Sequence, residues 1–123
     1  MLKEFKRVRQ EGGGQRRRWF EDDGMELVLW HDAVGAVTGF QILYGHGDGE
    51  HALTWRSESG FAHNRVDQGD TRAHMKLSPI LVPDGVVPWT LLRDEFATRS
   101  GGLDDPLRAL VLGKLNGRTA HGS

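Results

Sequence analysis

The sequence contains no cysteine, so disulfide bonds, thiolate nucleophiles and zinc sites built on cysteine ligands are excluded. Long apolar runs are missing too: "LVLW" and "ALVLG" are the longest, far short of the roughly 20 residues that span a bilayer. The opening "MLKEFKRVRQ" has charges throughout and no apolar run, unlike a secretory signal. We therefore expect a cytoplasmic protein with no membrane partner.

The composition that remains is typical of one globular domain. The chain has 123 residues, 37% of them hydrophobic and 27% charged, with 17 glycines that indicate many turns. A chain of this length buries roughly two thirds of its unfolded surface, so it needs no metal or disulfide to fold. We also find no cofactor motif and expect no cofactor.

Charge is spread unevenly along the chain. Residues 1–18 carry seven basic and two acidic side chains, a net of +5, whereas the remainder carries nine basic and fifteen acidic ones. Leu2, Phe5 and Val8 lie at helical spacing, which predicts a short helix over residues 1–10, and Gly12–Gly14 predict a hinge. We therefore divide the chain into a basic arm (1–15), a domain (16–117) and a flexible tail (118–123).

From residue 16 the hydrophobic pattern has a period of two. Five segments separated by turn residues are expected to form strands: "RRRWFED", "MELVLWHD", "AVTGFQILYG", "EHALTWRSE" and "FAHNRVDQ". A sixth, irregular strand is expected in "MKLSPILV", because proline confines it to an edge. No connection is long enough for a crossover helix, so the strands should form an antiparallel meander.

The last third of the chain changes to helical spacing. Pro88 is placed to begin a helix through residue 100, and a second helix should follow Asp104 or Asp105 and end at Asn116–Gly117. Strands followed by helices predict an α+β domain, an antiparallel meander sheet of five or six strands with two C-terminal helices packed on one face. The second helix should bury four side chains, Leu107, Leu110, Val111 and Leu115.

The stretch "GFAHNRVDQGD", residues 60–70, is the most polar of the expected strands. Alternation places Phe61, His63, Arg65 and Asp67 on one face. An imidazole, a guanidinium and a carboxylate together suit a small anionic ligand or a protein partner, so we expect a binding domain. The candidate site residues, from three neighbouring strands, are Gln41, Trp55, Arg56, His63, Arg65 and Asp67.

Alternative interpretations of this stretch stay open. The polar residues could form only the solvated face of a sheet, with cross-strand ion pairs. The chain could be an enzyme that uses His63 as acid or base on a small anionic substrate. His46, His51, His63 and His74 lie in the middle of the chain, but none of them has the spacing of a known ligand motif, so we expect no metal site.

Nucleic-acid binding through the basic arm is a further alternative. The segment "RRRWF" joins three arginines to two aromatic residues on an expected strand, a combination that stacks single-stranded bases in several folds. The acidic body and the absence of a known motif argue against nucleic acid as the main partner. A P-loop and a G-x-S-x-G elbow are also missing.

Four segments together resemble a family of small uncharacterised bacterial proteins. They are "GFQILYG", "ALTWR", "GFAHNRVDQGD" and "PILVPDG", and the resemblance covers roughly residues 16–115. The resemblance implies a bacterial domain. It implies no activity, substrate or catalytic residue.

Overall fold

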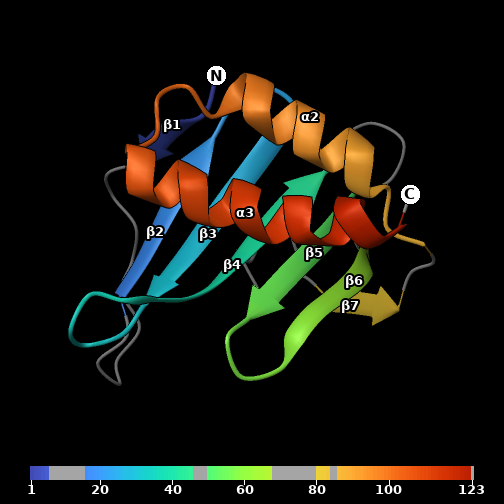
Figure 1. The fold of residues 1–123 in the computed structure, drawn as a ribbon, viewed down its shortest axis with the longest axis horizontal. Coiled ribbons are helices and arrows are strands. Elements are labelled where there is room, and N and C mark those ends of the chain that lie inside the picture. Colours follow the sequence, from blue (N-terminus) through green and yellow to red (C-terminus); the bar gives the residue numbers. More distant parts are fainter. Residues whose placement is uncertain (6–15, 46–49, 68–79, 84–85, 123) are drawn as a thin grey trace.

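The computed structural model describes residues 1–5, 16–45, 50–67, 80–83 and 86–122. It has an antiparallel sheet with two helices across one face, so the α+β prediction is confirmed (Figure 1). The elements, in chain order, are β1 (Lys3–Phe5), β2 (Arg16–Glu21), β3 (Met25–His31), β4 (Val37–Tyr44), β5 (His51–Arg56), β6 (Gly60–Asp67), β7 (Ile80–Pro83), α2 (Trp89–Arg99) and α3 (Asp105–Gly122).

The order of the strands in the sheet is their order in the chain. Each strand from β1 to β7 pairs antiparallel with the next, so every connection within the described sheet joins neighbours. Strands β2 to β6 are the five that the period-two pattern predicts, and β7 overlaps the end of the sixth expected segment, "MKLSPILV". The added strand is β1, which pairs with β2 and forms the first edge of the sheet.

Alternation along the strands separates a face that packs on the helices from a face that does not. Leu27 and Leu29 of β3 lie opposite Ile42 and Phe40 of β4, and all four belong to the main core. We call this the helix-side face. The core is completed by side chains of both helices, which explains why the helices lie across this face.

The two helices bury narrow apolar stripes. Leu92 and Phe96 of α2 are fully buried, one turn apart. On α3 the buried positions are Leu107, Val111 and Leu115, whereas Leu110 is only half-buried against the core. The prediction that Leu110 is buried is therefore wrong, because steps of four residues put it on the flank of the stripe.

The predicted helix over residues 1–10 is wrong for residues 1–5, the part of it that the structure describes. Lys3–Phe5 is a strand, and Leu2 is buried in the core with 2% of its surface exposed. The backbone N–H of Leu2 donates to the carbonyl oxygen of Arg99 at 2.8 Å. A free edge of the sheet satisfies more backbone groups than two isolated helical turns, so tertiary pairing overrides local spacing. Residues 6–15, with the predicted hinge, lie outside the described residues.

The predicted end of the last helix is also wrong. Helix α3 continues past Asn116 and Gly117 to Gly122. A glycine inside a helix costs about 1 kcal/mol, but it ends the helix only where it adopts a left-handed capping conformation. Gly117 stays helical, so the signal for termination is absent.

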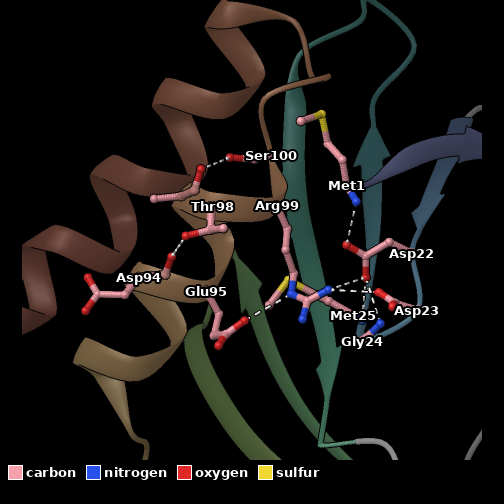
Figure 2. A network of polar contacts seen from close by, with 11 residues as sticks. Met1, Asp22, Asp23, Gly24, Met25, Asp94, Glu95, Thr98, Arg99 and Ser100 are labelled. Carbon is pink, nitrogen blue, oxygen red and sulfur yellow. Dashed lines mark hydrogen bonds and ion pairs between the residues drawn. The ribbon is translucent and has the colours of Figure 1, made fainter.

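A polar network ties the β2–β3 turn to the end of α2 (Figure 2). The carboxylate of Asp22, whose side chain is 4% exposed, accepts hydrogen bonds from the backbone N–H groups of Gly24 and Met25, both at 2.9 Å. It also accepts one from the guanidinium of Arg99 at 3.0 Å. The network therefore fixes the position of α2 relative to the sheet.

Candidate functional site

The pairing of β4, β5 and β6 gathers polar side chains at one end of the helix-side face. Tyr44 lies opposite His51, and His51 lies opposite Arg65. His63 lies opposite Leu53, one row nearer the centre of the sheet. Because Leu53 belongs to the core, these residues share the face that the helices cover. We call Tyr44, His51, His63 and Arg65 the ring cluster.

The hairpin between β5 and β6 sets this register. The last pair of the hairpin is Arg56 with Gly60, so three residues, 57–59, form the loop. Gly60 has a φ of 81°, a left-handed conformation that glycine adopts without strain. This geometry places His63 and Arg65 on the same face as His51 and Leu53, and puts Ala52 and Thr54 on the other face.

Three rings of the cluster stack across three strands. The ring centroids of Tyr44 and His51 are 5.2 Å apart, those of His51 and His63 are 5.9 Å apart, and those of Tyr44 and His63 are 6.0 Å apart. The planes are nearly parallel, at 26°, 12° and 16°. A hydrogen bond of 2.5 Å joins the hydroxyl of Tyr44 to Nε2 of His63. The bond fixes the orientation of that imidazole.

The chemistry available to the ring cluster follows from its groups. Imidazoles change charge near neutral pH, and a protonated imidazole donates two N–H groups. Both histidines are half-buried, whereas Arg65 is exposed at the edge of the cluster. A guanidinium matches the geometry of a carboxylate or phosphate with two parallel hydrogen bonds. The cluster therefore combines ring donors with an exposed cation.

Apolar contacts hold the other end of β5 and β6 under the helices. Trp55 stacks on Phe40 with 5.6 Å between ring centroids, and Phe61 meets Trp89 of α2 edge to face at 5.0 Å. Nζ of Lys114, on α3, lies 4.6 Å from the ring centre of Trp55. The stretch from residue 60 therefore begins in the core and reaches solvent at Arg65, so it is not a uniformly solvated face.

The six predicted site residues are divided between the two faces. Trp55, His63 and Arg65 lie on the helix-side face, whereas the side chain of Asp67 lies outside the described part of the structure. Gln41 and Arg56 lie on the opposite face. The amide of Gln41 donates to Oγ1 of Thr54 at 2.9 Å, so its partner is on that face too.

Sequence reasoning did not include Tyr44 and His51 in the site. Tyr44 ends β4 and His51 begins β5, and their side chains reach His63 only after β4, β5 and β6 are paired in the observed register. The signal that could have found them was the three-residue loop closed by Gly60, which selects one of the two possible frames.

The described residues hold no cluster of three or more histidine, aspartate or glutamate side chains placed to bind a metal. His51 and His63 stack ring against ring. His46 and His74, the other histidines considered from the sequence, lie outside the described residues.

Part of the positive charge near the N-terminus is paired within the fold. The guanidinium of Arg18 donates two hydrogen bonds of 2.9 Å to the carboxylate of Glu4, and it lies 3.9 Å from Asp104. The pKa of Arg18 is raised, chiefly by the hydrogen bond to Glu4. This side chain therefore joins β1 to β2 and to the start of α3.

No described helix is both long enough and apolar enough to cross a bilayer. Comparisons with models of protein families, with curated proteins and with solved structures find no match to the chain. The meander with its two helices defines the class, a small α+β domain. Its function has to be argued from the side chains alone.

Proposed function

We propose that the chain is a small binding domain that takes a small anionic ligand, a carboxylate or a phosphate, at the ring cluster. The observation that supports the proposal is the contact of three rings from three strands, next to an arginine in register with one of them. Histidine and arginine side chains are the donors that proteins use for such anions at neutral pH.

The ligand would bind between the exposed guanidinium of Arg65 and the imidazoles of His51 and His63. A protonated imidazole and a guanidinium both donate hydrogen bonds to an anion and attract its charge. The hydrogen bond between Tyr44 and His63 keeps this imidazole from rotating away. The site would therefore be organised before the ligand arrives, which lowers the entropic cost of binding.

Thermal unfolding with inorganic phosphate and with succinate tests the proposal. A ligand at about one hundred times its dissociation constant stabilises the folded state by about 2.7 kcal/mol, so the melting temperature should rise. The rise should be lost in Arg65→Gln and in His63→Gln. It should persist in Arg93→Gln, which changes an arginine of α2 that pairs with Asp94.

Chloride at matched ionic strength provides the salt control. An equal rise in wild type, Arg65→Gln and His63→Gln would contradict the proposal, because the anions would then act generally on the protein. An absence of any rise with either probe up to tens of millimolar would also count against it.

An enzyme is the second candidate, favoured by the hydrogen bond between Tyr44 and His63. His63 would accept the proton of a water molecule that attacks an ester of a small anionic substrate, and return it to the leaving oxygen. Hydrolysis of p-nitrophenyl phosphate is a direct probe. Turnover that is abolished in His63→Gln and kept in Arg93→Gln supports this candidate, and wild-type turnover no faster than in buffer rejects it.

The remaining expectations rest on the sequence. The absence of cysteine is in keeping with a cytoplasmic location. Four sequence segments support kinship with small bacterial proteins. Of the three arginines in "RRRWF", Arg18 is paired with Glu4, which leaves it less available to a nucleic acid.

A further inference from the structure

On the face of the sheet opposite the helices, arginine and tryptophan residues lie in one row across neighbouring strands. Across β2, β3, β4 and β5 the pairing runs from Arg17 to Trp30, then to Gly39, then to Arg56. The guanidinium of Arg56 lies over the ring of Trp30, 3.9 Å from its centre. Arg17 lies over the ring of Trp19, at 5.8 Å. Two cation–ring pairs therefore lie on this face, one within β2 and one that joins β5 to β3.

Gly39 makes the closer of these pairs possible. A Cβ atom at this position would lie 2.9 Å from Cδ of Arg56 and 2.7 Å from the backbone oxygen of Trp55. Both distances are shorter than real Cβ contacts, so any side chain would push Arg56 away from Trp30. Because Gly39 has no side chain, the side chain of Arg56 can pass over it and reach the ring of Trp30.

The next row on the same face is aromatic and neutral. Phe5, half exposed at 50%, lies opposite Trp19, and Val28, Gln41 and Thr54 continue the row. These two rows contain no acidic side chain in the described strands. Glutamates enter only in the third row, where Glu26 accepts a hydrogen bond from Nε1 of Trp19 at 3.1 Å. The charged side chains that the described strands place on the first two rows are the two arginines, Arg17 and Arg56.

We propose that this face binds single-stranded nucleic acid. We call its four central residues, Arg17, Trp19, Trp30 and Arg56, the Trp/Arg face. Planar bases would stack on the two tryptophan rings, and the phosphates between them would pair with the two guanidinium groups. Aromatic rings on a sheet with basic neighbours bind single strands in this way, without strong sequence preference.

The chemistry of the face selects this partner. Each arginine already covers an aromatic ring, so a base can replace a guanidinium on the ring while its phosphate keeps the cation nearby. A duplex offers no free base face for stacking, so it should bind more weakly. This surface is separate from the ring cluster. It includes Arg17 and Trp19 of the segment "RRRWF" considered in the sequence analysis, and adds Trp30 and Arg56 from β3 and β5.

Fluorescence anisotropy with a labelled oligothymidylate of about 12 nucleotides tests the proposal. Trp30→Ala should weaken binding about 5- to 150-fold, the range that corresponds to the loss of one stacked base. Arg56→Gln should weaken binding and lower the slope of log affinity against log salt by about one. The controls Arg93→Gln and His63→Gln should bind like wild type, since neither changes this face.

Circular dichroism of each variant checks the fold, and Arg56→Gln carries the test if Trp30→Ala does not fold. The proposal is overturned if wild type shows no binding at about 50 mM salt. It is equally overturned if a duplex of the same length binds as tightly, or if Arg56→Gln binds like wild type. Loss of phosphate binding in His63→Gln with oligonucleotide binding kept would separate this surface from the ring cluster.

Discussion

Asp22 is the central acceptor of the network in Figure 2. Its substitution by asparagine should destabilise the fold more than the same substitution at Asp23. The carboxylate has four partners: the N–H groups of Gly24 and Met25, the guanidinium of Arg99, and the amino group of Met1 at 3.4 Å. Asparagine keeps one acceptor oxygen for the turn but removes the charge that Arg99 pairs with.

The magnitude follows from burial. The side chain of Asp22 is 4% exposed and that of Arg99 is 27% exposed, so solvent screens this pair only in part. A hydrogen bond to a charged group contributes about 1.5–3 kcal/mol, and we expect a loss in the free energy of unfolding of that size. The matched control is Asp23→Asn. Asp23 pairs with the same arginine but is 95% exposed, so its loss should be under about 0.5 kcal/mol.

The pH dependence of the same variant gives a second measurement. Burial by itself would raise the pKa of Asp22, but the hydrogen bonds from Gly24, Arg99 and Met25 outweigh it and the pKa lies below its ordinary value. A carboxylate whose pKa falls on folding stabilises the protein fully above its unfolded pKa, near 4. That stabilisation is lost as the pH falls through the folded pKa.

Urea unfolding of wild type, Asp22→Asn and Asp23→Asn at pH 7 and below pH 3 makes the comparison. The difference between wild type and Asp22→Asn should be largest at pH 7 and should shrink in acid. Equal stability of the two at pH 7, or a difference that does not change with pH, would refute the reasoning.

Three further substitutions, two of them with a matched control, test the packing. Leu2→Ala should lower the free energy of unfolding by about 2–5 kcal/mol, because Leu2 is 2% exposed. A loss under about 0.5 kcal/mol would show that Leu2 is not part of the core. Leu115→Ala, at a fully buried site of α3, should cost a similar amount, whereas Leu91→Ala, at a 55% exposed site, should be nearly neutral. Gly39→Ala should cost about 1–3 kcal/mol, because its Cβ would meet a backbone oxygen at 2.7 Å. Gly113→Ala, in open space on a helix, should stabilise the fold by about 0.5–1 kcal/mol. Equal effects of the two substitutions would contradict the packing argument.

The sheet and the helices could be predicted from the sequence because their signals are local. Alternation in "MELVLWHD" and "AVTGFQILYG" places Leu27 and Ile42 on a buried face, and turn residues between the strands leave no room for a crossover. The start of α2 after Pro88 follows from the fixed φ of proline.

The edge strand and the ring cluster could not be predicted because they depend on pairing between distant segments. Leu2 and Phe5 fit a helical stripe as well as a strand, and only the free edge of β2 decides between them. Tyr44 and His63 are nineteen positions apart and meet across an intervening strand. A shift of one residue in the β5–β6 register would put His63 on the other face, so no single-strand pattern could bring them together.

The side-chain nitrogen signals of the histidines, followed by NMR during a titration with inorganic phosphate, test the proposed anion site most directly. The protein has six histidines, and the signals of His51 and His63 should shift together and saturate. His31 should stay unchanged, because it lies at the opposite end of β3 and bonds the carbonyl of Gly35. Signals of His51 and His63 that do not move, or that move no more than His31 does, would contradict the assignment of the ring cluster as the binding site.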